Sequence, residues 1–201
     1  AVVSGDDKIE YCKQLGAVLE VLDHPADARA LYDRALVLDR ARVERDPGRG
    51  MWRLDLSFSL ASIGSLLQKG GDLDGAVAHH QQAVDLRKGV VASEPNDEFA
   101  RNSLVRGYQR LASIEGRRGR IGESLSWYQA AIDVFLEQLR AHPERDQAWR
   151  DYSVTVFGSM SASLDLLEAQ KGSARSDRAR GLAVLRAHRL RHAPHGRRAR
   201  V

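Results

Sequence analysis

The most constraining feature of this sequence is a repeat with a period of 48 residues. A proline follows a polar residue at the same point three times, in Asp46-Pro47, Glu94-Pro95 and His142-Pro143. Proline halts one helix and permits another to begin shortly afterwards. The same offset aligns three further columns of residues: Leu15, Ile63 and Leu111; Tyr32, His80 and Tyr128; Ala35, Ala83 and Ala131. A fixed period of this size indicates an array of stacked units.

Each unit has the pattern of a helical hairpin. Leu56, Leu60, Ile63 and Leu67 recur at helical steps along one face of a first helix, and valines at positions 77, 84 and 91 do so in a second. Glycines at 70 and 71 and at 116 and 119 separate the two halves, and glycine ends helices and allows tight reversals. The pattern predicts an all-α chain with helices of about 18 to 22 residues. A hairpin cannot bury its apolar face alone, so stacking is expected.

These columns resemble the tetratricopeptide repeat, which alternates bulky and small residues along a helix pair. The match covers three units. It falls on Leu15, Gly16, Leu19, Ala28, Tyr32 and Ala35; on Leu60, Ile63, Gly64, Leu67, Ala76, His80 and Ala83; and on Tyr108, Leu111, Ala112, Tyr128 and Ala131. In the third unit Glu115 and Ser124 depart from the pattern, and all units exceed the usual length of about 34 residues. The resemblance implies an α-solenoid of about eight helices, arranged as antiparallel pairs in a right-handed superhelical stack.

The repeat divides the chain into units at about 10–46, 47–94, 95–142 and 143–170 onward, followed by a basic capping helix and tail at 171–201. Trp149, Tyr152, Val156 and Met160 form the stripe of an irregular fourth unit. The tail carries ten Lys or Arg against one acid, although the net charge of the whole chain is only +4. Two interpretations remain: a solubilising cap, or an arm for nucleic acid or another anionic surface.

In the tetratricopeptide family the first helix of each unit lines a concave groove. Carried over to this sequence, the partner-binding positions are Lys13, Phe58, Ser62, Ser65, Arg106, Gln109, Arg110 and Ser113. Some grooves of this family grip a terminal carboxylate with basic residues and two asparagines. Lys13, Arg106 and Arg110 fall on the basic positions, but Ala17 and Ser62 replace the asparagines. We therefore expect a groove for a peptide or protein partner, acidic in character.

Long units of this kind are also similar to arrays in bacterial signalling proteins, where many follow serine/threonine kinase domains. The expected function is an interaction scaffold or regulatory module, with the regulatory segment of such a kinase as the alternative. No glycine-rich phosphate loop, His-Arg-Asp or Asp-Phe-Gly motif occurs in this chain. The chain is therefore not expected to be an enzyme, although a catalytic domain could precede it.

No residues group into a catalytic or metal site. His79 and His80 are adjacent, so on a helix they point about 100° apart and cannot share a metal. His188, His192 and His195 lie among arginines that would repel a cation, and Cys12 stands alone. We predict no cofactor and no metal. There is also no apolar run of membrane-spanning length and no basic, apolar leader, so a cytoplasmic location is expected. The oligomeric state is left open.

Overall fold

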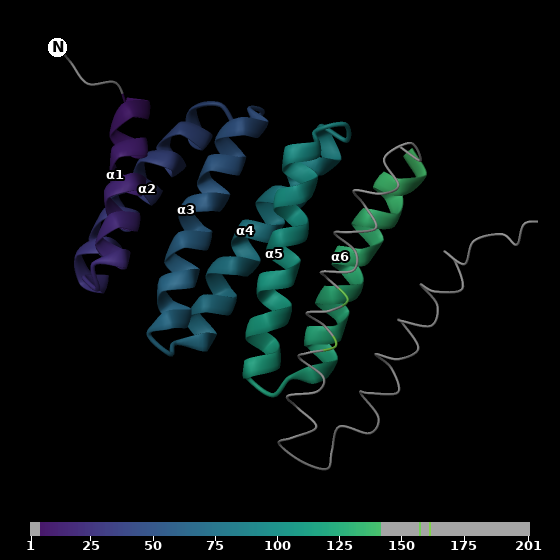
Figure 1. Cartoon of the computed structure of the whole chain (residues 1–201). Helices are drawn as coiled ribbons and strands as arrows, with labels where there is room; N and C mark the ends of the chain where they lie inside the picture. The colour runs from purple at the N-terminus through teal and green to yellow at the C-terminus, as the bar shows by residue number, and fades with distance from the viewer. Residues whose placement is uncertain (1–4, 142–156, 158–160, 162–201) are drawn as a thin grey trace, which may run out of the picture.

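The computed structural model describes residues 5–141 together with 157 and 161. Six α-helices and no strands lie in this part of the chain (Figure 1). They are α1 (Gly5–Val21), α2 (Pro25–Arg45), α3 (Gly50–Lys69), α4 (Leu73–Ser93), α5 (Glu98–Arg117) and α6 (Ile121–Ala141). The prediction of an all-helical chain is confirmed. The expected fourth unit from residue 143 and the basic segment 171–201, which would complete about eight helices, lie outside the described residues apart from those two positions.

Local sequence explains where the helices begin and end. The side chains of Asp72 and Asp97 cap α4 and α5 by accepting a hydrogen bond from the backbone N–H three residues on, at 2.8 and 3.0 Å. Pro25 begins α2, where its missing N–H costs nothing. Gly71 and Gly119 follow α3 and α5 with φ of 89° and 75°, a backbone conformation that glycine adopts without strain. Each hairpin turn is therefore encoded locally.

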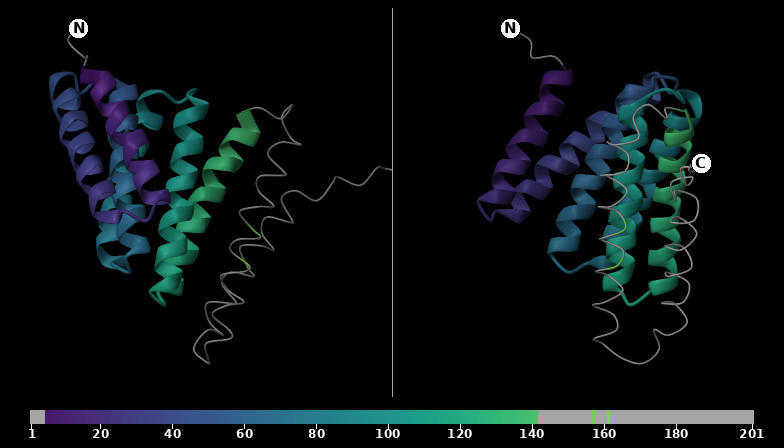
Figure 2. Two further views of the ribbon diagram at one scale, coloured as in Figure 1. Left: turned by 60° about the vertical axis from the view of Figure 1, so that its left-hand side comes forward. Right: turned by 45° about the vertical axis from the view of Figure 1, so that its right-hand side comes forward.

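The helices stack in chain order as an array of hairpins. The pairs α1–α2, α3–α4 and α5–α6 pack within hairpins, and α2–α3 and α4–α5 pack between them. Figures 1 and 2 show α1, α3 and α5 in one layer and the second helices of the hairpins in the other. Two of the first-layer helices, α3 and α5, also contact each other directly. Every interior helix thus has its apolar faces covered by neighbours in the array.

Small residues set the close approach within each hairpin. Gly16 and Gly64 face the rings of Tyr32 and His80, and a Cβ at either glycine would come within 2.7 and 2.9 Å of the ring. The alanine column at 35, 83 and 131 is fully buried. The repeated pattern of a small residue against a large ring therefore fixes the spacing between paired helices.

Candidate functional site

A cavity of about 340 Å³ opens between α3, α4 and α5. Five of the eight predicted groove residues line it: Phe58, Ser62, Ser65, Arg106 and Arg110. The first-layer helices α1, α3 and α5 all contribute, and α4 reaches in from the second layer. The cavity wall also includes Glu20 of α1 and two residues of α4, His80 and Arg87.

His80 forms the floor of the cavity. The residue is 3% exposed and its ring packs against Gly64. Its Nε2 atom is buried and has no hydrogen-bond partner. Burial, assisted by the charges of Arg110 and Arg87, lowers the pKa of His80 to about 4. The ring is therefore neutral at neutral pH, and its unpartnered Nε2 lies on the side of the ring that packs against Gly64.

Arg87 brings a fixed positive charge to the same cavity. It is 4% exposed, its Nε donates to the Ser57 hydroxyl at 2.9 Å, and its Nη1 donates to the Ser103 carbonyl at 2.8 Å. Its guanidinium also lies 5.0 Å from the centre of the Phe58 ring. Burial, followed by repulsion from Arg106, lowers the pKa of Arg87 to about 10. The group stays protonated at neutral pH, and its contacts hold it in one orientation.

The cavity carries an excess of positive charge. Arg106 and Arg110 are exposed at its rim, and Arg106 donates to the Ser103 hydroxyl at 3.1 Å. Within the described part of the chain, no carboxylate pairs with Arg87, Arg106 or Arg110.

The one acid of the cavity wall is already engaged. Glu20 accepts hydrogen bonds from Lys69 and from the Tyr32 hydroxyl. Although burial alone would raise the pKa of Glu20, these two partners lower it overall. Glu20 therefore stays ionised and bound to its neighbours, and it does not offset the arginines.

The remaining three predicted groove residues lie elsewhere. Lys13 pairs with the buried carboxylate of Asp39 at 2.9 Å and donates to the Asp55 carbonyl at 3.3 Å. Gln109 and Ser113 are half-buried on α5 but do not line the cavity. The structure thus brings the α3 and α5 positions together, and it places Lys13 in a structural contact between helices.

Two residues of the cavity, His80 and Arg87, come from α4, whereas the resemblance implies groove positions only on the first helix of each unit. In the sequence His80 occupies the tyrosine column of the repeat, and Arg87 belongs to none of the aligned columns. Both lie on the inward face of α4, since positions 80, 84 and 87 follow helical spacing. An arginine in that buried stripe was a signal, because an arginine is rarely buried without a partner.

Residues 59–96, from the middle of α3 to just beyond the end of α4, match the family model described as tetratricopeptide repeat. This segment is a tetratricopeptide repeat. Among solved structures, the crystal structure of BtubC (BKLC) from P. vanneervenii matches with 15% identity, a TM-score of 0.39, and coverage of 98% of this chain and 94% of that chain. No curated protein matches the sequence.

Tetratricopeptide repeats serve in general as protein-interaction scaffolds and are typically not catalytic. Among residues 5–141, 157 and 161, no group of three or more His, Cys, Asp or Glu side chains is placed to hold a metal ion. No helix in this same part of the structure has the length and apolar character needed to cross a membrane.

Proposed function

We propose that this chain is a protein-interaction module that binds a peptide segment of a partner at the α3–α4–α5 cavity. An acidic side chain of the partner enters beside Arg87, Arg106 and Arg110. The observation that carries the proposal is this cluster of three arginines, which has no carboxylate partner among the described residues. The tetratricopeptide repeat at 59–96 supports the general role in protein binding.

The cavity suits a carboxylate for physical reasons. A guanidinium offers planar donors that match two carboxylate oxygens, and such charge-assisted hydrogen bonds are stronger than neutral ones. Arg87 is already oriented by Ser57 and Ser103, so little side-chain entropy is lost when it binds. The partly buried wall also screens the charges less than bulk water does. A single acidic side chain would relieve the repulsion between Arg87 and Arg106.

The proposal is tested with labelled peptides rich in glutamate and leucine, compared with the same peptides carrying glutamine for glutamate. Fluorescence anisotropy at low and physiological salt measures the affinity. We expect the glutamate peptides to bind more tightly, with an affinity that falls as salt rises. Replacing both rim arginines, Arg106→Gln with Arg110→Gln, should weaken binding by about tenfold to a hundredfold, which corresponds to the net loss of one charge-assisted hydrogen bond of about 1.5–3 kcal/mol.

A matched control removes the same charge from the same helix. Arg101→Gln with Arg117→Gln lies on α5 but outside the cavity, and it should leave the affinity within about twofold, the size of a general screening effect. Equal binding of glutamate and glutamine peptides, or equal weakening by the two pairs of substitutions, would show that the cavity does not select an acidic side chain.

A further inference from the structure

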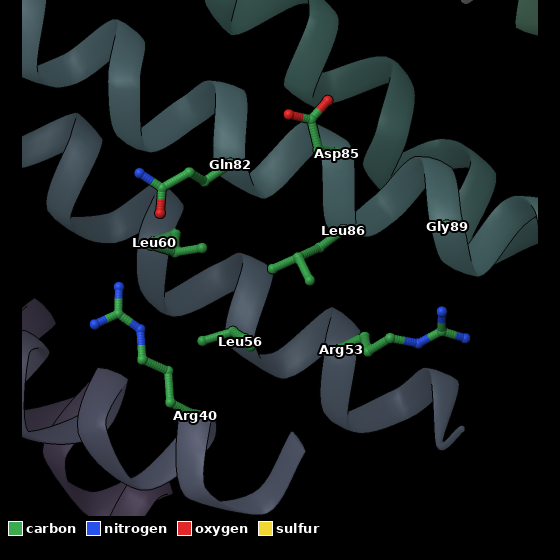
Figure 3. Close-up of a pocket in the computed structure, with 8 residues that line it drawn as sticks. All are labelled: Arg40, Arg53, Leu56, Leu60, Gln82, Asp85, Leu86 and Gly89. Atoms are coloured by element: carbon green, nitrogen blue, oxygen red, sulfur yellow. The ribbon is translucent and has the colours of Figure 1, made fainter. Parts of the chain in front are cut away.

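A second cavity lies on the other side of α3. It has a volume of about 480 Å³ and is bordered by α2, α3 and α4. Its floor is apolar: Leu56 and Leu60 of α3 meet Leu86 of α4 there, and Figure 3 shows the three side chains directed toward one another. At about 100° per residue, Leu56 and Leu60 point away from Phe58 and Ser62 of the arginine-lined cavity. The two cavities are therefore separate surfaces.

The equivalent space one repeat further along the array shows which side chains can occupy a position like that of the second cavity. One period further on, between α4, α5 and α6, Tyr108 stacks on Trp127 with their ring centres 5.7 Å apart. The Nζ atom of Lys88 lies 5.7 and 5.9 Å from these two ring centres. This space thus holds a stacked aromatic pair with a cation near both rings, an arrangement that is favourable in itself.

The first gap keeps the cation but not the rings. Leu60 stands 48 residues before Tyr108, and His79 stands 48 residues before Trp127. His79 turns back to its own helix, where its Nδ1 hydrogen-bonds the Gly75 carbonyl at 2.9 Å. Arg40 occupies the place of the lysine, and Figure 3 shows its side chain reaching toward Leu60. The cavity therefore includes the position that the Tyr108 ring occupies in the following unit, where Leu60 leaves no ring.

The rim adds a preference for negative charge. The Nε atom of Arg53 is buried without a hydrogen-bond partner, and Arg40 has no ion-pair partner among the described residues. The one acid of the rim, Asp85, already contacts Lys88 at 3.8 Å and accepts from Gln81 at 3.1 Å. Arg53 also donates its Nη2 to the Ser93 hydroxyl at 2.9 Å, so its Nη1 and the Arg40 guanidinium are the groups left to face a ligand.

We propose that this second cavity binds an aromatic side chain of a partner protein, with a carboxylate next to it in the partner. The ring would lie on the leucine floor with Arg40 against its face, as Lys88 lies against Tyr108 and Trp127. The adjacent carboxylate would accept from Arg53. The chain then holds two contact surfaces on opposite sides of α3, one for an acidic group and one for an acidic aromatic segment.

The probe for this site is N-acetyl-tryptophan, which carries both an indole ring and a carboxylate. Titration into the isotope-labelled chain, followed by NMR, should shift the methyl signals of Leu56, Leu60 and Leu86 and the amide of Gly89. N-acetyl-leucine and the uncharged N-acetyl-tryptophanamide are the matched controls, and both should bind more weakly. Equal shifts with N-acetyl-leucine, or shifts only at the α5 arginines, would overturn the proposal.

Substitutions test the comparison between the two gaps. Leu60→Tyr with His79→Trp installs the aromatic pair of the following unit, so the fold should persist and the probe shifts should disappear. Arg40→Gln is an independent test at an exposed position, and it should weaken binding about two- to fivefold, the contribution of one cation–π contact. Arg34→Gln, exposed on the same helix, should leave binding unchanged. Undiminished binding in Arg40→Gln and in the filled variant would refute the assignment.

Discussion

The buried carboxylate of Asp39 should be a principal determinant of how the first hairpin stacks on the second. Asp39 of α2 is fully buried and accepts from the Ser59 hydroxyl of α3 at 2.6 Å. It also pairs with Lys13 of α1 at 2.9 Å and with Arg42 at 3.4 Å. One side chain therefore joins three helices. We predict that Asp39→Ala lowers the free energy of unfolding by about 3 kcal/mol.

This magnitude follows from what the substitution leaves behind. Removing one partner of a buried ion pair costs about 3–5 kcal/mol, because the other charge stays buried without compensation. For Asp39→Ala we expect the lower end of this cost, because both cationic partners keep other contacts. Lys13 remains 20% exposed and keeps the Asp55 carbonyl, and Arg42 keeps contacts with Asp6 and Asp55.

Urea unfolding followed by circular dichroism measures the loss, and thermal unfolding should show a fall in Tm of roughly 6–12 °C for a chain of this size. Asp33→Ala is the matched control, because it breaks an exposed ion pair with Arg29. The side chain of Asp33 is 48% exposed and that of Arg29 is 37% exposed. That change should cost less than about 0.5 kcal/mol. Replacing both members of the buried pair, Asp39→Leu with Lys13→Leu, should recover most of the loss. If Asp39→Ala were no more damaging than Asp33→Ala, the buried contacts would contribute nothing net and the reasoning would be wrong.

Three further predictions concern the close contacts in the array. Gly64→Ala should lower the free energy of unfolding by about 1–3 kcal/mol in a urea titration, since its Cβ would lie 2.9 Å from the His80 ring; Gly5→Ala, with nothing nearby, is the control. The pKa of His80 is lowered to about 4 in the folded state, so the unfolded chain binds its proton first as pH falls. Stability should therefore decline between about pH 6.5 and 4, by up to about 3 kcal/mol, and a His80→Tyr variant should lack this part of the decline. Trp127→Ala should cost about 2–4 kcal/mol in the same unfolding assay by removing its stack on Tyr108 and its contact with Lys88; a loss below about 1 kcal/mol would contradict that role for the stacked pair.

The sequence alone determined the class of fold and the positions of the turns after α3 and α5, but not the turn between α1 and α2. Helical spacing, the aspartate caps and the glycines after α3 and α5 act within a few residues of each other, so they can be identified without knowing the partner helix. The 48-residue period also identified the small residues that let paired helices approach. Five of the groove positions that the tetratricopeptide resemblance implies, Phe58, Ser62, Ser65, Arg106 and Arg110, line one cavity of the structure.

Only the tertiary structure decided how charges meet between helices. Lys13 occupies the same first-helix layer as the cavity residues, yet it binds Asp39, because the packing of α1 on α2 brings a buried carboxylate within reach. Arg87 lines the cavity from the second layer, because α4 packs against both α3 and α5. Positions 39 and 87 are equivalent in the repeat, and one holds an acid whereas the other holds a base. Periodicity gives the face on which a side chain lies, but its electrostatic partner depends on distances across the stack, which only the packed helices fix.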